Sequence, residues 1–262
     1  MQTISIITIC FNNLADVQKT CASVDAQTIQ PFEHWIINGS TKNDIADWLK
    51  ATSQPPYRKW LNEKDKGISD AFNKGIERAK GTIIHLLNSG DIYADESILS
   101  IVKEAFQNNA TIQWVSGKIK IKRAGQWIEV GKPFDKKQLY KGMRSIAHPT
   151  WFLRKEVYNR AGIFNLNYSI AMDYDLMCRI KDEPYQFINK TMIVFDNTGI
   201  SSNNYIKSLQ QNVTVYESYF GYSVKCRVWQ MRLKFLHYLL QTSFGKFLFK
   251  IKKDFNSYIL FG

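Results

Sequence analysis

The first hundred residues alternate between short apolar runs and stretches with helical periodicity, and this alternation constrains the fold more than any other feature. Residues 5–10 and 82–87 are apolar and rich in β-branched side chains, typical of strands buried on both faces. Residues 34–37 and 58–62 indicate two further strands. Helical spacing of apolar residues lies between the strands, at 14–24, 44–51 and 68–79. The pattern predicts an α/β fold with a mostly parallel sheet and flanking helices.

Polar side chains follow three of these strands, at residues 8–12, 38–41 and 88–91. Parallel strands end at the same edge of a sheet, and ligands of open α/β sheets bind outside those carboxyl ends. The sequence therefore predicts a ligand site at this edge, independently of any motif.

The second half of the chain has different signals. Strict alternation at 118–122, followed by 126–130, predicts a β-hairpin. Residues 131–147 are basic and predict a loop with a short helix, and residues 173–180 predict a helix. Residues 203–222 and 224–255 are helical in pattern and rich in aromatic side chains.

Positive charge is concentrated in this second half. The whole chain carries 35 basic and 23 acidic residues, a net charge of +12. Residues 1–110 hold 11 basic and 13 acidic side chains, whereas residues 111–262 hold 24 and 10, a net of +14. This asymmetry indicates a polyanionic partner, such as nucleic acid, a phosphorylated ligand or an anionic membrane.

Other composition features narrow the class of protein. No apolar run is long enough to span a bilayer alone, and the opening residues lack the basic start of a secretory signal. The four cysteines show no zinc-site spacing, so we expect reduced thiols in a cytoplasmic protein.

One ordered set of motifs resembles the family 2 glycosyltransferases of the GT-A fold, in particular their bacterial surface-polysaccharide branch. Residues 63–76 read EKDKGISDAFNKGI, followed by AKG at 79–81 and LNSGD at 87–91. The opening SIITICFNN and the NGST at 38–41 fit in order and spacing. The resemblance is dense over residues 3–95 and weaker through 148–179. It implies a nucleotide-sugar half (1–115), an acceptor half of the same GT-A domain (116–200) and a basic amphipathic helical extension (201–262).

The resemblance implies a donor site and a metal ligand at the sheet edge. Asp91 matches the metal-binding aspartate, with Gly90 where relatives often carry an acid. A cation there, Mn²⁺ or Mg²⁺, would offset the charge on the diphosphate leaving group and keep water and phosphate oxygens as further ligands. The alternative is that Asp91 only caps the turn. The positions implied to bind the nucleotide sugar are Thr8, Phe11, Asn12, Asn38, Asp65, Lys66, Gly67, Asn88 and Ser89.

Asn38 carries a second interpretation, and two other positions near the donor motif are expected to be structural. Relatives usually have aspartate at Asn38, where it pairs with the base, so uridine is the default and guanosine or thymidine remain open. Asn38 beside Gly39 also fits an ordinary turn. We expect Asp70 and Asn73 to serve as helix cap and packing hydrogen bonds.

The acceptor side of the resemblance centres on Asp173. This residue matches the general base that takes the acceptor proton in an inverting transfer, whereas we expect Asp175 to support the structure. Met172 stands where many relatives have glutamate. His148 matches a family element and would contact donor phosphates, metal or acceptor, although a histidine there can also be structural. His85 lies in an apolar segment and is expected to be structural.

The C-terminal segment predicts a contact with a membrane surface. Residues 225–253 hold eight Lys or Arg and no Asp or Glu. Apolar side chains lie at helical spacing on one face: Phe244, Phe247, Leu248, Ile251 and Phe255. A basic amphipathic helix of this kind lies in the membrane interface and favours anionic lipid. Packing back onto the domain or across a dimer is the alternative.

Together these features predict an inverting glycosyltransferase that uses a nucleotide sugar, a UDP-sugar by default. The resemblance implies a lipid-linked or oligosaccharide acceptor in surface polysaccharide or lipopolysaccharide assembly, at the inner face of the cell membrane. A nucleotidyltransferase would need a glycine-rich loop after the first strand, where the chain reads CFNN. A nucleic-acid-binding protein lacks a supporting motif. A catalytically degenerate relative stays open, since Asn38, Gly90 and Met172 depart from the common pattern.

Overall fold

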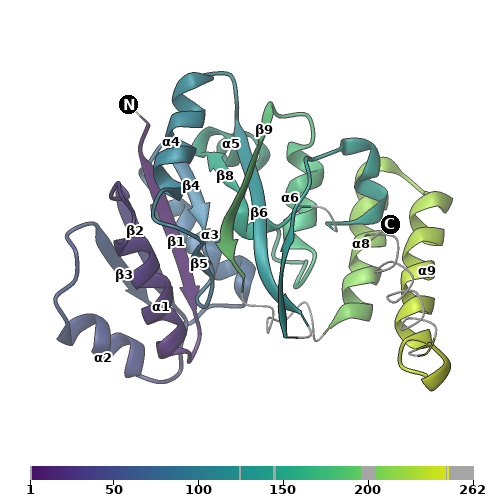
Figure 1. Cartoon of the computed structure of the whole chain (residues 1–262), viewed down its shortest axis with the longest axis horizontal. Coiled ribbons are helices and arrows are strands. Elements are labelled where there is room, and N and C mark those ends of the chain that lie inside the picture. Colours follow the sequence, from purple (N-terminus) through teal and green to yellow (C-terminus); the bar gives the residue numbers. More distant parts are fainter. Residues whose placement is uncertain (1, 124, 144–145, 196–203, 246, 248–262) are drawn as a thin grey trace, which may run out of the picture.

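One nine-stranded sheet forms the centre of the protein (Figure 1). The computed structural model describes residues 2–123, 125–143, 146–195, 204–245 and 247. The strands are β1 (Ile4–Cys10), β2 (Glu33–Asn38), β3 (Arg58–Asn62), β4 (Ile83–Leu86), β5 (Ile92–Tyr93), β6 (Trp114–Arg123), β7 (Gln126–Val130), β8 (Phe152–Arg154) and β9 (Tyr185–Val194). Their order is β3-β2-β1-β4-β8-β6-β9-β5, with β7 paired to β6.

Helices flank this sheet and continue beyond it. They are α1 (Leu14–Asp25), α2 (Asp44–Ala51), α3 (Ile68–Arg78), α4 (Ile98–Asn108), α5 (Lys155–Ala161), α6 (Met172–Ile180), α8 (Tyr205–Phe220) and α9 (Val224–Leu239), with 3₁₀ turns η1 (Lys136–Lys141) and η2 (His148–Thr150). Helices α8 and α9 lie side by side at the end of the molecule opposite α2 (Figure 1).

The four strands predicted in the first half are confirmed and run parallel as neighbours. Every residue of β1 is buried, as its β-branched run predicts. The register pairs Cys10 with Asn38, and Asn38 with Asn62, so the carboxyl ends of β1, β2 and β3 meet at one edge. This alignment brings the predicted polar turns together.

The second half turns the sheet into a mixed one. Strand β8 runs antiparallel to β4, β6 runs antiparallel to β8, and β9 runs parallel to β6. The predicted hairpin is confirmed as β6 and β7, with Ile121 opposite Ile128. The sequence analysis did not predict β5, α4, α5 or β9. Strand β9 is only partly buried and has a mixed polar sequence, so it lacks the continuous apolar run of β1.

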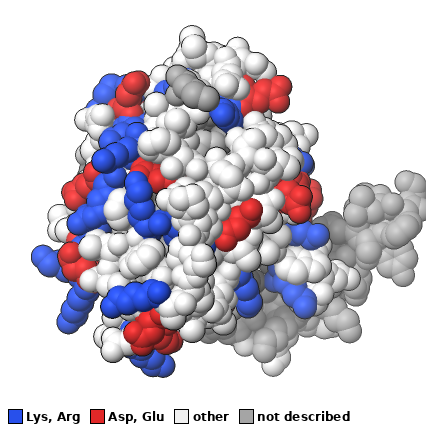
Figure 2. All heavy atoms as spheres, turned by 90° about the vertical axis from the view of Figure 1, so that its left-hand side faces the viewer, with Lys and Arg blue, Asp and Glu red and all other residues white. Residues whose placement is uncertain are grey.

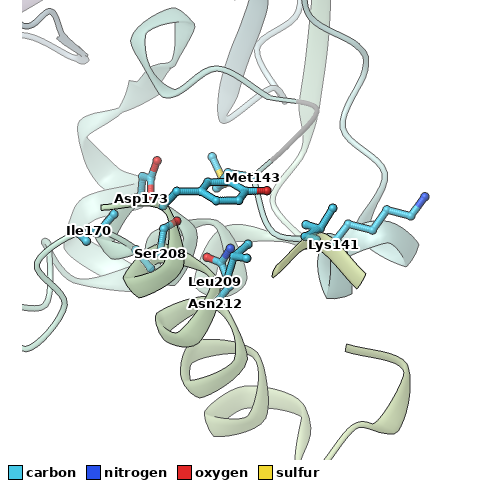
Figure 3. A pocket seen from close by; sticks show the side chains of 10 residues that line it. Lys141, Met143, Ile170, Asp173, Ser208, Leu209 and Asn212 are labelled. Carbon is cyan, nitrogen blue, oxygen red and sulfur yellow. The ribbon is translucent and has the colours of Figure 1, made fainter. Parts of the chain in front are cut away.

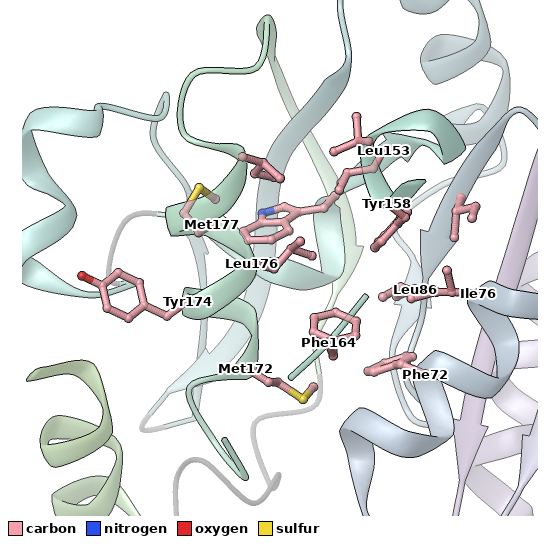
Figure 4. Close-up of a cluster of buried hydrophobic side chains, with 14 of the residues drawn as sticks. Phe72, Ile76, Leu86, Leu153, Tyr158, Phe164, Met172, Tyr174, Leu176 and Met177 are labelled. Carbon is pink, nitrogen blue, oxygen red and sulfur yellow. The ribbon is translucent and has the colours of Figure 1, made fainter. Parts of the chain in front are cut away.

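A shared hydrophobic core joins the two halves of the sheet (Figure 4). Phe72 of α3 and Leu86 of β4 belong to the same buried cluster as Met172 and Leu176 of α6, with Phe164 between them. Helix α6 is therefore fixed against the helix that follows the 63–67 loop. Burial of these apolar side chains stabilises the junction between the two parts.

A polar clamp reinforces this junction. The Asn73 side chain, 7% exposed, donates to the Phe164 carbonyl and accepts from the Phe164 amide, both at 2.9 Å. The packing role predicted for Asn73 is confirmed. The amide and the carbonyl of Phe164 thus both have hydrogen-bond partners. An apolar side chain at position 73 would leave these two main-chain groups without them.

The C-terminal helices lie outside the sheet and contact α6 through α8. None of the described helices is long and apolar enough to cross a membrane. Phe244 and Phe247 of the predicted apolar face are 64% and 60% exposed, whereas Leu248, Ile251 and Phe255 lie outside the described residues.

Acidic and basic side chains are intermixed on the face at the α2 end, which Figure 2 shows. This face belongs largely to residues 1–110, whose charges nearly cancel. The positive surplus of the chain therefore belongs to the other half, which contains β6, β7, η1, α8 and α9.

Candidate active site

Asn12 links the loops that follow β1 and β2. Its backbone has φ +53, a conformation that asparagine tolerates better than most residues. The Asn12 side-chain oxygen accepts from the amides of Thr41 and Lys42 at 3.1 and 3.2 Å, and the Asn12 amide donates to Ser40 Oγ at 2.8 Å. These hydrogen bonds hold the two loops together. Phe11, in the first of them, is 59% exposed.

Asn38 is almost buried, and its amide already has protein partners. Its Nδ2 donates to Asn62 Oδ1 at 2.9 Å, and its Oδ1 accepts from the Ser40 amide at 3.1 Å. An aspartate at this position could not donate to Asn62 Oδ1, so this contact favours an amide side chain here.

Asp65 lies against the end of β2. Its Oδ1 accepts from the Gly67 amide at 3.0 Å, and a Cβ atom on Gly39 would overlap its carboxylate. The neighbouring Lys66 amide donates to Asp70 at 2.8 Å, so the predicted structural role of Asp70 at the start of α3 is confirmed. Asp65 is thus brought to the edge formed by residues 38–41, as the motif order predicted.

The turn at 88–91 follows β4 and is tied to α1. Thr20 Oγ1 donates to the Asp91 carbonyl at 2.8 Å and accepts from the Gly90 amide at 3.0 Å. Asn88 Nδ2 donates to Asp91 Oδ2 at 3.3 Å, and Asp91 is 1% exposed. Gly90 has φ +99, a conformation that a residue with a side chain adopts only with strain, so glycine fits this turn.

Thr8 and Ser89 differ in what they offer a ligand. Thr8 is fully buried, and its hydroxyl forms a hydrogen bond of 2.9 Å with His34 Nε2 of the neighbouring strand. The Thr8 side chain therefore already has a partner within the protein. Ser89 lies in the 88–91 turn, where its Oγ accepts from Asn13 Nδ2 at 2.6 Å.

Asp91 is the carboxylate that could bind a metal ion at the 88–91 turn. Within the described ranges, no group of three or more His, Cys, Asp or Glu side chains could hold a metal by itself. A cation at this turn would have one carboxylate from the protein, and the remaining ligands would be water and phosphate oxygens. Mg²⁺ and similar hard cations accept this arrangement.

Asp173 faces a cavity of about 230 Å³ at the start of α6 (Figure 3). Its Oδ1 accepts from the Tyr174 amide at 2.7 Å, yet burial dominates and raises the pKa of Asp173 from 3.8 to about 6. The cavity walls come from four segments of the chain. The lining residues are Lys141, Met143, Ile170, Ala171, Asp173, Tyr205, Ser208, Leu209, Asn212 and Leu233.

The segment that carries Asp173 contacts the start of α3. Ser69, in the first turn of α3 after Gly67, has its hydroxyl 2.7 Å from the Met172 sulfur and 3.3 Å from the Tyr168 carbonyl. Met172 precedes Asp173 in the chain. The start of α3 and the start of α6 are therefore in contact.

His148 is packed among aromatic rings. The rings of Phe72 and Phe164 lie 5.8 Å away and that of Trp151 lies 5.1 Å away. Burial lowers the pKa of His148 to about 4, so it is neutral at physiological pH. His85 stacks on Phe152 and its ring nitrogens contact Tyr93 and Pro149, which confirms its structural role.

The C-terminal helices contribute a wall of the cavity that the sequence pattern did not predict. Tyr205, Ser208 and Asn212 of α8 line the cavity. Their spacing of three and then four residues places them on one face of the helix. The sequence alone could therefore have predicted that α8 has a polar face. Only the contact between α6 and α8 shows that this face meets Asp173.

The sheet topology, with polar turns at the ends of its parallel strands, is that of a GT-A fold. The family model described as Glycosyl transferase family 2 matches residues 5–162. The chain therefore belongs to glycosyl transferase family 2.

Related proteins include an uncharacterized glycosyltransferase of Mycobacterium tuberculosis, 28% identical over 77% of this chain and 78% of that protein. A PGL/p-HBAD biosynthesis glycosyltransferase of Mycobacterium bovis is 25% identical over 66% of this chain and 67% of that protein. Both names class the relatives as glycosyltransferases.

Solved structures show the same fold at low sequence identity. S. aureus TarS 1-349 in complex with UDP-GlcNAc has a TM-score of 0.62 at 13% identity, over 84% of this chain and 68% of that one. The mannosyltransferase PcManGT of Pyrobaculum calidifontis, in complex with GDP-Man and Mn²⁺, has a TM-score of 0.60 at 12% identity, over 96% and 79%. Of the longer TarS chain, this protein spans 40%.

The raised pKa of Asp173 predicts a pH-dependent change in stability on substitution. The folded protein holds this proton more tightly than the unfolded chain, so ionisation costs stability as the pH rises through about 6. Asp173→Asn should therefore melt about 2–6 °C above the wild type near pH 8, with little difference near pH 4.

Calorimetry at the two pH values measures this difference. Asp182→Asn is the control, because lysines 181 and 136 lower the pKa of the exposed Asp182 to about 2 and its removal should give no gain at pH 8. If Asp173→Asn melts at the same temperature as the wild type at pH 8, the claim that burial raises the pKa of Asp173 is contradicted.

Proposed function

We propose that this protein is an inverting glycosyltransferase that moves a sugar from a nucleotide-sugar donor, a UDP-sugar by default, to a lipid-linked or oligosaccharide acceptor. The observation that carries the proposal is the Asp173 carboxyl, whose pKa burial raises to about 6, in a cavity at the start of α6, a helix that contacts the start of α3. The UDP-GlcNAc bound to TarS supports a nucleotide-sugar donor. The M. bovis relative is named for PGL/p-HBAD biosynthesis, which supports a biosynthetic role, and we propose that this role is the assembly of a surface polysaccharide or lipopolysaccharide. Residues 1–115 would bind the donor, and residues 116–200 and 201–262 the acceptor side.

The donor would lie along the edge formed by the four parallel strands. The exposed Phe11 ring offers the nucleoside an apolar surface, and Asp65, which lies against Gly39, and Lys66 would contact the donor from the loop before α3. Asn38 Nδ2 donates one of its two N–H groups to Asn62, and its Oδ1 already accepts from the Ser40 amide and the Cys10 thiol, so the second N–H is the group that Asn38 would offer a base. Asp91, with Asn88 and Ser89 beside it, would hold a divalent cation, Mn²⁺ or Mg²⁺. Such a cation neutralises charge on the departing diphosphate.

Asp173 would act as the general base of the transfer. Its carboxylate takes the proton from the acceptor hydroxyl while that oxygen bonds to the anomeric carbon and the carbon–diphosphate bond breaks. Attack from the side opposite the leaving group inverts the anomeric configuration. A pKa of about 6 leaves the carboxylate ionised at neutral pH yet more basic than an ordinary aspartate. His148, neutral because of burial, would serve as a hydrogen-bond partner of acceptor or phosphate.

Asp173→Asn separates catalysis from donor binding. The variant loses the proton acceptor and should slow transfer about 10²–10⁴-fold, while its affinity for the nucleoside diphosphate stays near that of the wild type. Release of nucleoside diphosphate reports transfer, and calorimetry reports binding.

Asp47→Asn on α2, an exposed carboxyl far from the cavity, is the matched control and should leave both quantities unchanged. Transfer at the wild-type rate by Asp173→Asn removes Asp173 as the base. An equal loss of donor affinity would place Asp173 in the donor site instead.

Association with a membrane surface is the second part of the proposal. Helix α9 exposes an apolar stripe at alternating spacings of four and three residues, formed by Val224, Val228, Met231, Phe235 and Tyr238, each at least half exposed. Phe244 and Phe247 follow it. This spacing defines one face of a helix.

Charge favours an anionic membrane over a second copy of the chain as the partner of this stripe. Residues 225–253 contain eight Lys or Arg and no acid, so two such helices would repel one another. The same cations attract anionic headgroups while the apolar side chains enter the interface. We therefore propose a peripheral protein at the inner, cytoplasmic face of the cell membrane.

Phe235→Ser tests this contact against a matched phenylalanine. Phe235 is 64% exposed on α9, and Phe32 is 52% exposed beside β2. Burying one phenylalanine contributes about 1.5–3 kcal/mol, so Phe235→Ser should bind vesicles of phosphatidylglycerol and phosphatidylcholine about tenfold more weakly. Phe32→Ser should bind as the wild type does. Cosedimentation measures both, and equal binding by the two variants contradicts the membrane role of α9.

A further inference from the structure

Lys141 connects the Asp173 cavity to a group of aromatic side chains. The stem of Lys141 lines the cavity on the side opposite Asp173 (Figure 3). Its ammonium lies 4.9 Å from the ring centre of Trp229 and 5.5 Å from that of Tyr140, and it donates to Gln138 Oε1 at 2.9 Å. The charge is therefore held at the end of the cavity, where η1 meets α9.

Two more cations lie on the same rings. Lys225 Nζ is 4.2 Å from the ring centre of Tyr140, and the Arg232 guanidinium is 5.3 Å from that of Trp229. The two rings meet edge to face at 6.0 Å. Gln230, 4% exposed, donates to the Tyr140 carbonyl at 3.2 Å and fixes η1 against α9. The residues Tyr140, Lys141, Lys225, Trp229 and Arg232 are called the η1–α9 cluster below.

The positive charge of this cluster is not neutralised by the described part of the protein. Within that part, none of its three cations forms an ion pair with a carboxylate, whereas nearby Arg227 pairs with Glu217 at 2.7 Å. A cation over a ring gains only about 0.5–1 kcal/mol at exposed sites. Three like charges held on two rings repel one another, and a bound anion relieves that repulsion.

We propose that the η1–α9 cluster binds a phosphate or diphosphate group carried by the acceptor. The acceptor hydroxyl would lie at Asp173, the sugar that carries it would fill the cavity, and the phosphate would lie at Lys141 and its neighbours. Lysine and arginine donate charge-assisted hydrogen bonds to phosphate oxygens. This inference rests on the proposed function, and it specifies an acceptor that is phosphorylated close to the sugar receiving the transfer.

Pyrophosphate is the probe for this subsite. The full-length protein is titrated with pyrophosphate in EDTA, so that no divalent cation assists binding at Asp91. The double variant Lys141→Gln, Lys225→Gln removes two cluster charges. The control, Lys50→Gln with Lys80→Gln, removes two exposed charges at α2 and just beyond α3.

The wild type and the control should bind one pyrophosphate with similar affinity, and the cluster variant should bind at least tenfold more weakly. Equal affinity in all three proteins, equal loss in both variants, or no binding to the wild type overturns the subsite. UDP with Mn²⁺ is titrated into EDTA-free samples of the same proteins. Binding of UDP to the wild type and the cluster variant shows that the variant is folded and separates failure of the subsite from failure of the donor site.

Competition identifies the source of the phosphate. Vesicles of phosphatidic acid and phosphatidylcholine that displace pyrophosphate from the wild type support a lipid-linked acceptor at this subsite. Pyrophosphate that stays bound in their presence supports a soluble phosphorylated sugar at the same cluster.

Discussion

The position of Asp173 depends on a buried ion pair between Asp175 and Arg179, further along the same helix α6. Asp175, 1% exposed, accepts from Arg179 at 2.8 Å and from the Tyr219 hydroxyl of α8 at 2.7 Å. Arg179 also donates to the carbonyl of Gly162 at 2.8 Å. A buried carboxylate without partners is strongly destabilising, so these groups must stay together. They fix α6 between the segment after α5 and helix α8, and thereby aim Asp173 into the cavity.

The donor edge is fixed in a different way, by loops that bind one another. Asn12 joins the turns after β1 and β2, and Thr20 joins α1 to the turn at 88–91. The clamp between Asn73 and Phe164 then connects this edge to the segment before α6. A transfer between two bound substrates needs both held in one geometry, which lowers the entropic cost of reaction. The protein provides this with contacts that exist before either substrate binds.

The sequence predicted the parts of the fold that depend on local pattern. The β-branched run ending at Cys10 predicted a strand buried on both faces, and motif spacing predicted the structural roles of Asp70, Asn73 and Asp175. Strand β9 and helices α4 and α5 were missed. The cavity wall was missed too, because Ser208 and Asn212 meet Asp173 only through long-range packing. Likewise, only the folded structure shows that the Thr8 hydroxyl forms a hydrogen bond with His34 of the neighbouring strand.

The central claim is that the edge formed by the polar turns is a site for a nucleoside diphosphate. A calorimetric screen of UDP, GDP, dTDP and CMP, each with and without Mn²⁺, tests it most directly, because a ligand that binds only the folded state raises the melting temperature. We expect one nucleoside diphosphate, UDP by default, to bind in a manner that requires Mn²⁺ and Asp91. A folded protein that binds none of the four nucleotides, with or without Mn²⁺, would contradict the assignment of this edge.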